Sequence, residues 1–104
     1  MCASLEYFQD QWRSGQTCRC GIWAINDRWT PVPDAAIYWR ILDAAGQEQI
    51  SGKWDVSMPE DSVQKLGTAE WTAAASGSYQ LRAEVRDQSG HRLSQNMFDF
   101  VIVQ

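Results

Sequence analysis

The sequence predicts an all-β protein built as a two-layered antiparallel sandwich. Three observations support this class: short segments of alternating polarity, turn signals between them, and no sustained helical period in the 104 residues. The clearest segment is 77–87, in which Tyr79, Leu81, Ala83 and Val85 alternate with polar residues. Successive side chains of a strand point to opposite faces, so this strand has one dry side that a second sheet must cover.

Seven segments are predicted as strands. The first, at 4–8, is short and is expected at a sheet edge. The second, at 17–26, is apolar on both faces, with Cys18, Cys20, Ile22 and Ala24 opposite Trp23 and Ile25. This pattern predicts either a central strand or a strand covered by a neighbouring domain. The other five strands are expected at 35–43, 49–58, 61–71, 79–87 and 91–103.

The turns between these strands have recognisable chemistry. The segments 43–46 and 87–90 both read Asp-x-x-Gly, which predicts a type I turn closed by a left-handed glycine in a bulged hairpin. Prolines at 31, 33 and 59 interrupt strand pairing because proline has no N–H donor. Segment 72–77 is predicted to be a loop.

Two aromatic residues refine the fold class to an immunoglobulin-like sandwich of about seven strands. Tyr79 follows Gly-Ser at a strand start, where such domains carry a tyrosine corner, and Trp39 matches their buried tryptophan. The usual inter-sheet disulfide is not matched, because the place near Leu81 that would pair with Cys20 holds no cysteine. Apolar packing alone is therefore expected to hold the sheets together.

The bulk properties fit one domain and narrow the range of partners. A chain of 104 residues and 11.8 kDa can bury a core without a metal or a disulfide. The net charge is −4, and the nine Lys and Arg residues are scattered along the sequence, which argues against nucleic acid as a partner. No apolar run approaches the roughly 18 residues of a membrane span, and no signal peptide is expected.

Five stretches together resemble one known family. They are Asn-Asp at 26–27 after a strand, Tyr-Trp-Arg-Ile-Leu-Asp-Ala-Ala-Gly at 38–46, Gly-Ser-Tyr-Gln-Leu at 77–81 with the turn at 87–90, and Asn-Met-Phe-Asp-Phe at 96–100. They resemble the immunoglobulin-like accessory domain of glycoside hydrolase family 2 enzymes, which include β-mannosidase-like, β-galactosidase-like and β-glucuronidase-like proteins. The resemblance covers about 5–103.

The resemblance implies a non-catalytic role. In that family the catalytic carboxylates lie in a separate (β/α)₈ barrel, and none of the family's catalytic motifs is present in this sequence. Residues 1–104 are therefore expected to be one domain of a larger glycosidase that braces or flanks the barrel. The expected partners are the catalytic and neighbouring domains of the parent chain, with carbohydrate as a further candidate, and no cofactor is expected.

The chemically active residues do not form a recognisable catalytic or metal site. Glu60 and Asp61 follow a proline in a turn and are expected to be solvated, and His91 is expected to be exposed in a hairpin. Cys2, Cys18, Cys20 and His91 show no zinc-ligand spacing. Cys18 and Cys20 are expected to be small buried residues rather than a disulfide, and unpaired cysteines slightly favour a cytoplasmic location.

The sequence is unusually rich in tryptophan, with six residues of this type. Trp39 and Trp54 fall on apolar strand faces and are predicted to be core residues. The other candidates, each for a glycan or an interdomain contact, are Trp29, Trp12, Trp71 and Trp23. Two other functions therefore stay open: a carbohydrate-binding module that stacks sugars on exposed tryptophans, and a fibronectin-like module that binds proteins through its edge strands.

Overall fold

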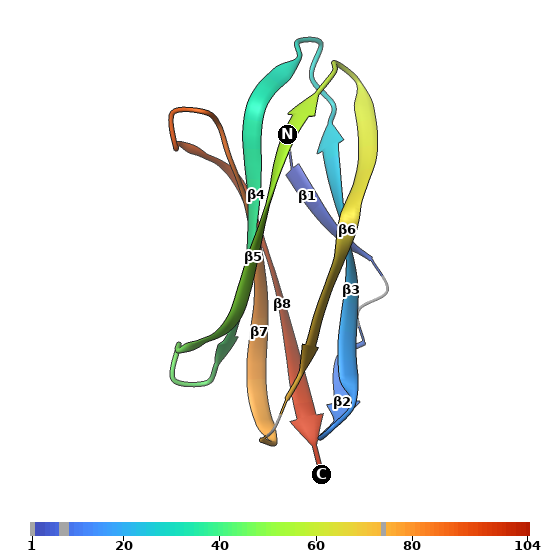
Figure 1. The fold of residues 1–104 in the computed structure, drawn as a ribbon, viewed down its shortest axis with the longest axis vertical. Coiled ribbons are helices and arrows are strands. Elements are labelled where there is room, and N and C mark those ends of the chain that lie inside the picture. Colours follow the sequence, from blue (N-terminus) through green and yellow to red (C-terminus); the bar gives the residue numbers. More distant parts are fainter. Residues whose placement is uncertain (1, 7–8, 74) are drawn as a thin grey trace.

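The computed structural model describes residues 2–6, 9–73 and 75–104, and these residues form two β-sheets packed face to face (Figure 1). Within them lie eight strands: β1 (Cys2–Glu6), β2 (Gln11–Arg13), β3 (Thr17–Asn26), β4 (Val32–Asp43), β5 (Glu48–Met58), β6 (Ser62–Thr72), β7 (Gly77–Arg86) and β8 (Arg92–Val103). Across these described ranges, no helix is long and apolar enough to cross a membrane.

The strand order confirms the predicted immunoglobulin-like sandwich. One sheet has the order β1-β3-β6, and the other has the order β2-β8-β7-β4-β5. Figure 1 shows the two layers side by side, with β1, β3 and β6 in one and β4, β5, β7 and β8 in the other. Among the described pairs, only β2 and β8 run parallel. β3 lies between β1 and β6, so its two apolar faces belong to a central strand.

Most strand bounds follow the prediction, with two corrections at the N-terminal end. β1 covers Cys2–Glu6 rather than 4–8, and the positions of Tyr7 and Phe8 lie outside the described residues. The short strand β2, at Gln11–Arg13, was not predicted, and it contains Trp12, which lies outside the seven expected strands. Three residues are too few to show a period, and β2 exists because it pairs with the end of β8.

The core lies between the inner faces of the two sheets. In β3 and β7 the inward side chains are the ones that the alternation predicted, and each is almost fully buried: Cys18, Cys20, Ile22, Ala24, Leu81, Ala83 and Val85. Trp39 is also buried and stacks on Trp54, with 6.4 Å between ring centroids. Both predictions of core tryptophans are therefore confirmed.

The tyrosine corner is present near the start of β7. The Tyr79 hydroxyl donates a hydrogen bond of 2.8 Å to the carbonyl oxygen of Ala75. The Tyr79 ring stacks on Phe100 and meets the edge of Trp71, with centroids 5.8 Å and 4.9 Å apart. The hydroxyl lies at the surface rather than buried, because only the ring faces the core.

The two Asp-x-x-Gly turns close two separate hairpins with the same hydrogen-bond pattern. In the first, Asp43 Oδ1 accepts from the backbone N–H groups of Ala45 and Gln47, at 2.9 Å and 2.8 Å. In the second, Asp87 Oδ1 accepts from the N–H groups two and four residues later, at 2.9 Å and 3.0 Å. Gly46 and Gly90 have φ of 83° and 84°, as the turn requires. Figure 1 shows both hairpin ends reaching out on the same side, one near each end of the sheet.

Candidate functional site

The loop that carries Trp29 is held by a buried side chain. Asn26 is 1% exposed at the end of β3, and its Nδ2 donates to the carbonyl oxygens of Thr30 and Pro59, at 3.1 Å and 2.9 Å. Its Oδ1 accepts from the N–H of Arg28 at 3.2 Å. These bonds fix the loop while Trp29 stays 85% exposed. Asn26, the first residue of the Asn-Asp pair, therefore anchors the loop.

Trp12 and Trp71 lie in the packed interior, so neither offers an exposed ring. Trp12 is 7% exposed, and its Nε1 donates to the Gln9 carbonyl oxygen at 2.8 Å. Trp71 is half-buried and faces inward, because its partner across β3 is the buried Cys18. Burial of Trp12 contradicts the surface role expected for it, because strand alternation turns its ring towards the core, whereas Trp71 is partly buried against Tyr79 and Phe100.

Trp23 lies on the outer face of the three-stranded sheet. Its neighbours on that face are Ile25, in the same strand, and Val63, which pairs with Ile25 across β6. Val63 is 63% exposed, and a hollow of about 360 Å³ adjoins these three residues together with Ser4 and Leu5. The Lys65 ammonium lies 5.8 Å from the centroid of the Trp23 ring. This outward cluster of Trp23, Ile25 and Val63 is called the apolar face below.

A second hollow, also of about 360 Å³, adjoins the loop that carries Trp29. Its walls are the residues around Trp29 and the turn between β7 and β8: Arg28, Thr30, Pro31, Val32, Pro33, Asp87, Gln88, Ser89 and Leu93. The lining mixes proline rings with polar groups. Trp29 lies between two of the lining residues, Arg28 and Thr30, and its own side chain is exposed.

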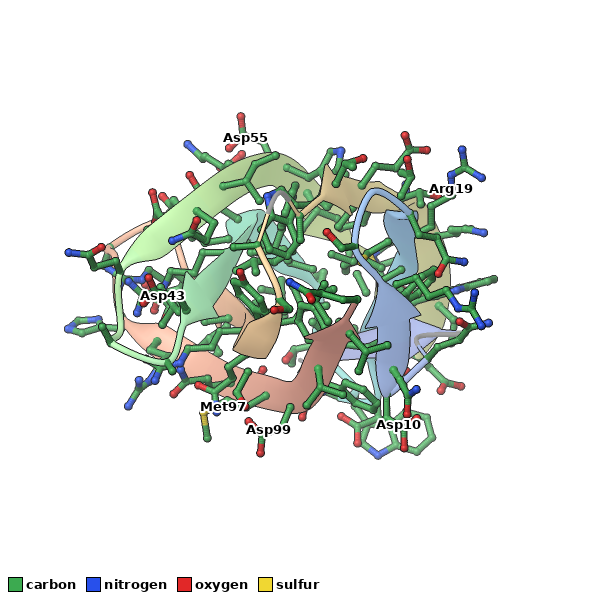
Figure 2. The ribbon with its side chains drawn as sticks, turned by 90° about the horizontal axis from the view of Figure 1, so that it is seen from below. Asp10, Arg19, Asp43, Asp55, Met97 and Asp99 are labelled. Carbon is green, nitrogen blue, oxygen red and sulfur yellow. The ribbon has the colours of Figure 1, made fainter. Side chains whose placement is uncertain are left out.

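A third hollow, of about 680 Å³, lies on the outer face of the five-stranded sheet. It is called the groove below. Its lining residues are Tyr38, Trp39, Arg40, Glu48, Ser51, Gly52, Lys53, Arg82, Glu84, Arg86, Arg92, Gln95 and Met97. Figure 2 shows Met97 pointing out from β8, while Arg19 points out from the other layer.

The groove corrects the description of the basic residues as scattered. Five of the nine Lys and Arg residues line it, against two carboxylates, Glu48 and Glu84. Strand alternation brings them together, because outward positions of neighbouring strands are in register. The sequence carried the signal as Arg82-x-Glu84-x-Arg86, but the rows across the sheet depend on pairings that one sequence does not reveal.

The cysteines and His91 form no reactive centre. Among the described residues no disulfide joins the three cysteines; Cys18 and Cys20 are buried, as predicted, and burial raises the pKa of Cys18 to about 11. His91 is exposed in its hairpin, 3.7 Å from Asp87 Oδ2. Within residues 2–6, 9–73 and 75–104, no group of three or more His, Cys, Asp or Glu side chains is arranged to hold a metal.

The turn carboxylates are also at the surface. Glu60 and Asp61 are exposed between β5 and β6, and Asp61 adopts a left-handed backbone with φ of 49°. Its N–H donates to the Arg28 carbonyl oxygen at 3.0 Å. These acids therefore shape the turn beside the Asn26 anchor.

The fold and its outward surfaces define an immunoglobulin-like β-sandwich module. More specifically, the chain belongs to the Mannosidase Ig/CBM-like domain family, whose model matches residues 19–101. This membership confirms the resemblance to the accessory domains of glycoside hydrolase family 2 enzymes. No curated protein matches the sequence.

Solved structures show the same fold at low identity. The CARDB domain of the PF1109 protein from Pyrococcus furiosus, determined in complex with di-metal ions, is 20% identical with a TM-score of 0.76, covering 97% of this chain and 85% of that one. β-Glucuronidase 2 of Bacteroides uniformis, covalently bound to cyclophellitol-6-carboxylate aziridine, is 12% identical with a TM-score of 0.66, covering 96% of this chain. The match spans 12% of the glucuronidase chain.

Proposed function

We propose that this domain is a non-catalytic accessory module of a glycoside hydrolase family 2-type enzyme. The observation that carries the proposal is the apolar face of Trp23, Ile25 and Val63, which points away from the core. The domain that bears it belongs to the Mannosidase Ig/CBM-like family. Contiguous apolar surface of this kind marks an interface more often than a solvated surface. The partner is a neighbouring domain of the parent chain, which the apolar face braces.

The first test is the mass of the native protein that carries this sequence, measured by intact mass spectrometry after immunoprecipitation. A mass many times 11.8 kDa is expected. A mass near 11.8 kDa would mean a stand-alone module and would end the accessory-domain proposal.

The second test asks whether the apolar face is covered in the parent. Val63→Lys places a charge in the face, and Thr68→Lys places the same charge at another exposed site of β6 as a control. In the isolated domain both variants should keep the melting temperature. In the parent protein only Val63→Lys should speed hydrogen exchange in β3 and β6, because a buried, unpaired charge opens the interface. Equal exchange in the two parent variants contradicts the proposal.

A carbohydrate-binding module is the second candidate, and the exposed indole of Trp29 beside the second hollow favours it. Sugar rings can lie on such an aromatic face while polar groups of the hollow bind their hydroxyls. Titration of the isolated domain with a broad panel of neutral glycans should reveal a ligand, and Trp29→Ala should abolish its binding while Trp23→Ala leaves it unchanged. Failure of the whole panel to bind removes this candidate.

A further inference from the structure

We propose that the groove on the five-stranded sheet binds an acidic oligosaccharide, whose carboxylate or sulfate groups are held by Arg40 and Arg82. The groove is larger than the two hollows beside Trp23 and the loop of Trp29, and it is formed by side chains from β4, β5, β7 and β8. It is independent of the apolar face and of Trp29, so it does not rest on the function proposed above.

The arrangement of Arg40 and Arg82 is unfavourable unless an anion accompanies it. The two residues are direct partners across β4 and β7, and both point out of the sandwich. Like charges directly opposite each other on neighbouring strands destabilise a sheet. An anion placed between the guanidinium groups turns this repulsion into attraction.

The other cations of the groove already have partners, and this pair does not share them. Glu84 accepts from Arg86 at 2.8 Å and lies 4.0 Å from Arg92. Lys53 lies 3.3 Å from Asp55, and the hydrogen bond between them raises the pKa of Lys53. These pairs leave the Arg40 and Arg82 positions as the electropositive centre of the groove.

Arg40 and Arg82 keep most of their donors open. Arg82 donates through Nε to Gln80 Oε1, at 2.5 Å, which leaves its terminal amino groups for a ligand. Among the described residues, the Arg40 side chain makes no hydrogen bond and no ion pair. A guanidinium group presents paired donors that match a carboxylate or sulfate in bidentate geometry.

The strands beneath the groove favour a saccharide over a peptide. β4 and β7 are internal strands, paired on both sides, so their backbone groups cannot accept an added peptide strand. Recognition at Arg40 and Arg82 must therefore use side chains, and Ser51, Gln95 and Glu48 supply the mixed donors and acceptors that sugar hydroxyls require. Two cations already lie 5.5 Å from the Tyr38 ring centroid, so the ring holds cations in place.

The experiment is a calorimetric titration of the isolated 104-residue chain with oligogalacturonate, a sulfated oligosaccharide, a neutral oligosaccharide of equal length and poly-glutamate. At least one acidic oligosaccharide should bind, with affinity that falls as salt is added, while the neutral sugar and poly-glutamate do not. Carboxylate and sulfate ligands are distinguished by which of the two acidic sugars binds.

The variants test the two arginines separately. Arg40→Gln and Arg82→Gln should each weaken binding by about ten-fold or more, since each removes a charge-assisted bidentate contact. Arg19→Gln, on the other sheet, and Trp29→Ala should keep the affinity of the unmodified chain. Arg40→Lys should lie between Arg40→Gln and the unmodified chain, because it keeps the charge and loses the paired donors.

Stability measurements keep the result interpretable. Arg40→Gln should keep or raise the melting temperature, because it relieves the repulsion with Arg82. The proposal is overturned if no acidic oligosaccharide binds, if poly-glutamate or the neutral sugar binds equally well, or if folded Arg40→Gln and Arg82→Gln bind like the unmodified chain.

Discussion

The indole of Trp39 lies against Gly52, its partner across β5, and occupies the space that a Cβ at position 52 would need. A similar relationship joins the sheets, because a Cβ at Gly67 of β6 would come within 2.8 Å of Trp54 Cζ2. The stacked pair of Trp39 and Trp54 therefore fits between two strands only because each indole meets a residue without a side chain.

Gly52→Ala should destabilise the domain by about 1–3 kcal/mol, the usual range for overpacking. The added methyl group collides with a buried ring that is packed on its other side by Trp54. Denaturant unfolding measures the change, with the neighbouring outward substitution Ser51→Ala as a control that should stay within about 0.5 kcal/mol. An unchanged midpoint for Gly52→Ala would contradict this packing.

Trp12 is buried and Trp29 is exposed, so their replacement by alanine should affect the stability of the domain very differently. Trp12→Ala should cost about 3–5 kcal/mol, because a large buried ring is removed and a cavity remains. Trp29→Ala should change stability by less than about 0.5 kcal/mol, because the ring is exposed. Thermal or urea unfolding of both variants decides the matter, and equal effects would refute the assignment of Trp12 to the core.

Tyr79→Phe should lower stability by about 0.5–1 kcal/mol, through loss of the hydrogen bond to the Ala75 carbonyl oxygen. The value lies at the low end because water can reach that carbonyl when the hydroxyl is removed. The ring remains packed on Trp71 and Phe100, so the circular dichroism of the folded variant should not change. A loss of several kcal/mol would show that the Tyr79 hydroxyl stabilises the domain through more than this one hydrogen bond.

Asn26→Ala should cost about 1–3 kcal/mol, because two carbonyl oxygens and one N–H lose a buried partner. The loop that carries Trp29 should also gain freedom, which faster hydrogen exchange of its backbone N–H groups would report. Gln64→Ala, at an exposed site of β6, serves as the control. If Asn26→Ala matches the control, the anchor is not needed.

Alkaline pH should destabilise the domain partly through Cys18. Its pKa is about 11 in the folded protein and 9.0 when the thiol is solvated, so the unfolded chain loses the proton first. The stability contributed by the neutral thiol is complete below pH 9 and declines as the pH rises towards 11. Unfolding free energies measured across this range should fall less steeply for Cys18→Ala; parallel curves would contradict the burial of the thiol.

The sequence predicted the fold where the residues repeat, and it failed where position depends on a distant strand. Leu81, Ala83 and Val85 alternate without interruption, and their face followed directly. Trp12 could not be placed in the same way, because a three-residue strand has no period and its burial depends on pairing with β8.

The candidate sites show the same division. The residues around Trp29 indicate a loop before Pro31, but whether the ring packs on the sandwich or stays exposed did not follow from them. The groove was missed because Arg40 and Arg82 are far apart in sequence and meet only through the register of β4 and β7. A sequence pattern gives the face of a strand, whereas a surface site needs the order of the strands.

The parallel pairing of β2 with β8 has a mechanical consequence. Hydrogen bonds from Ser14 N to Val103 O, 2.7 Å, and from Val101 N to Asp10 O, 3.0 Å, join the two strands. Tension that enters through the chain before β2 and leaves after β8 pulls two parallel strands in opposite directions. Their bonds are then loaded together in shear instead of opening one after another. The domain can therefore transmit force along a chain while its sandwich stays closed.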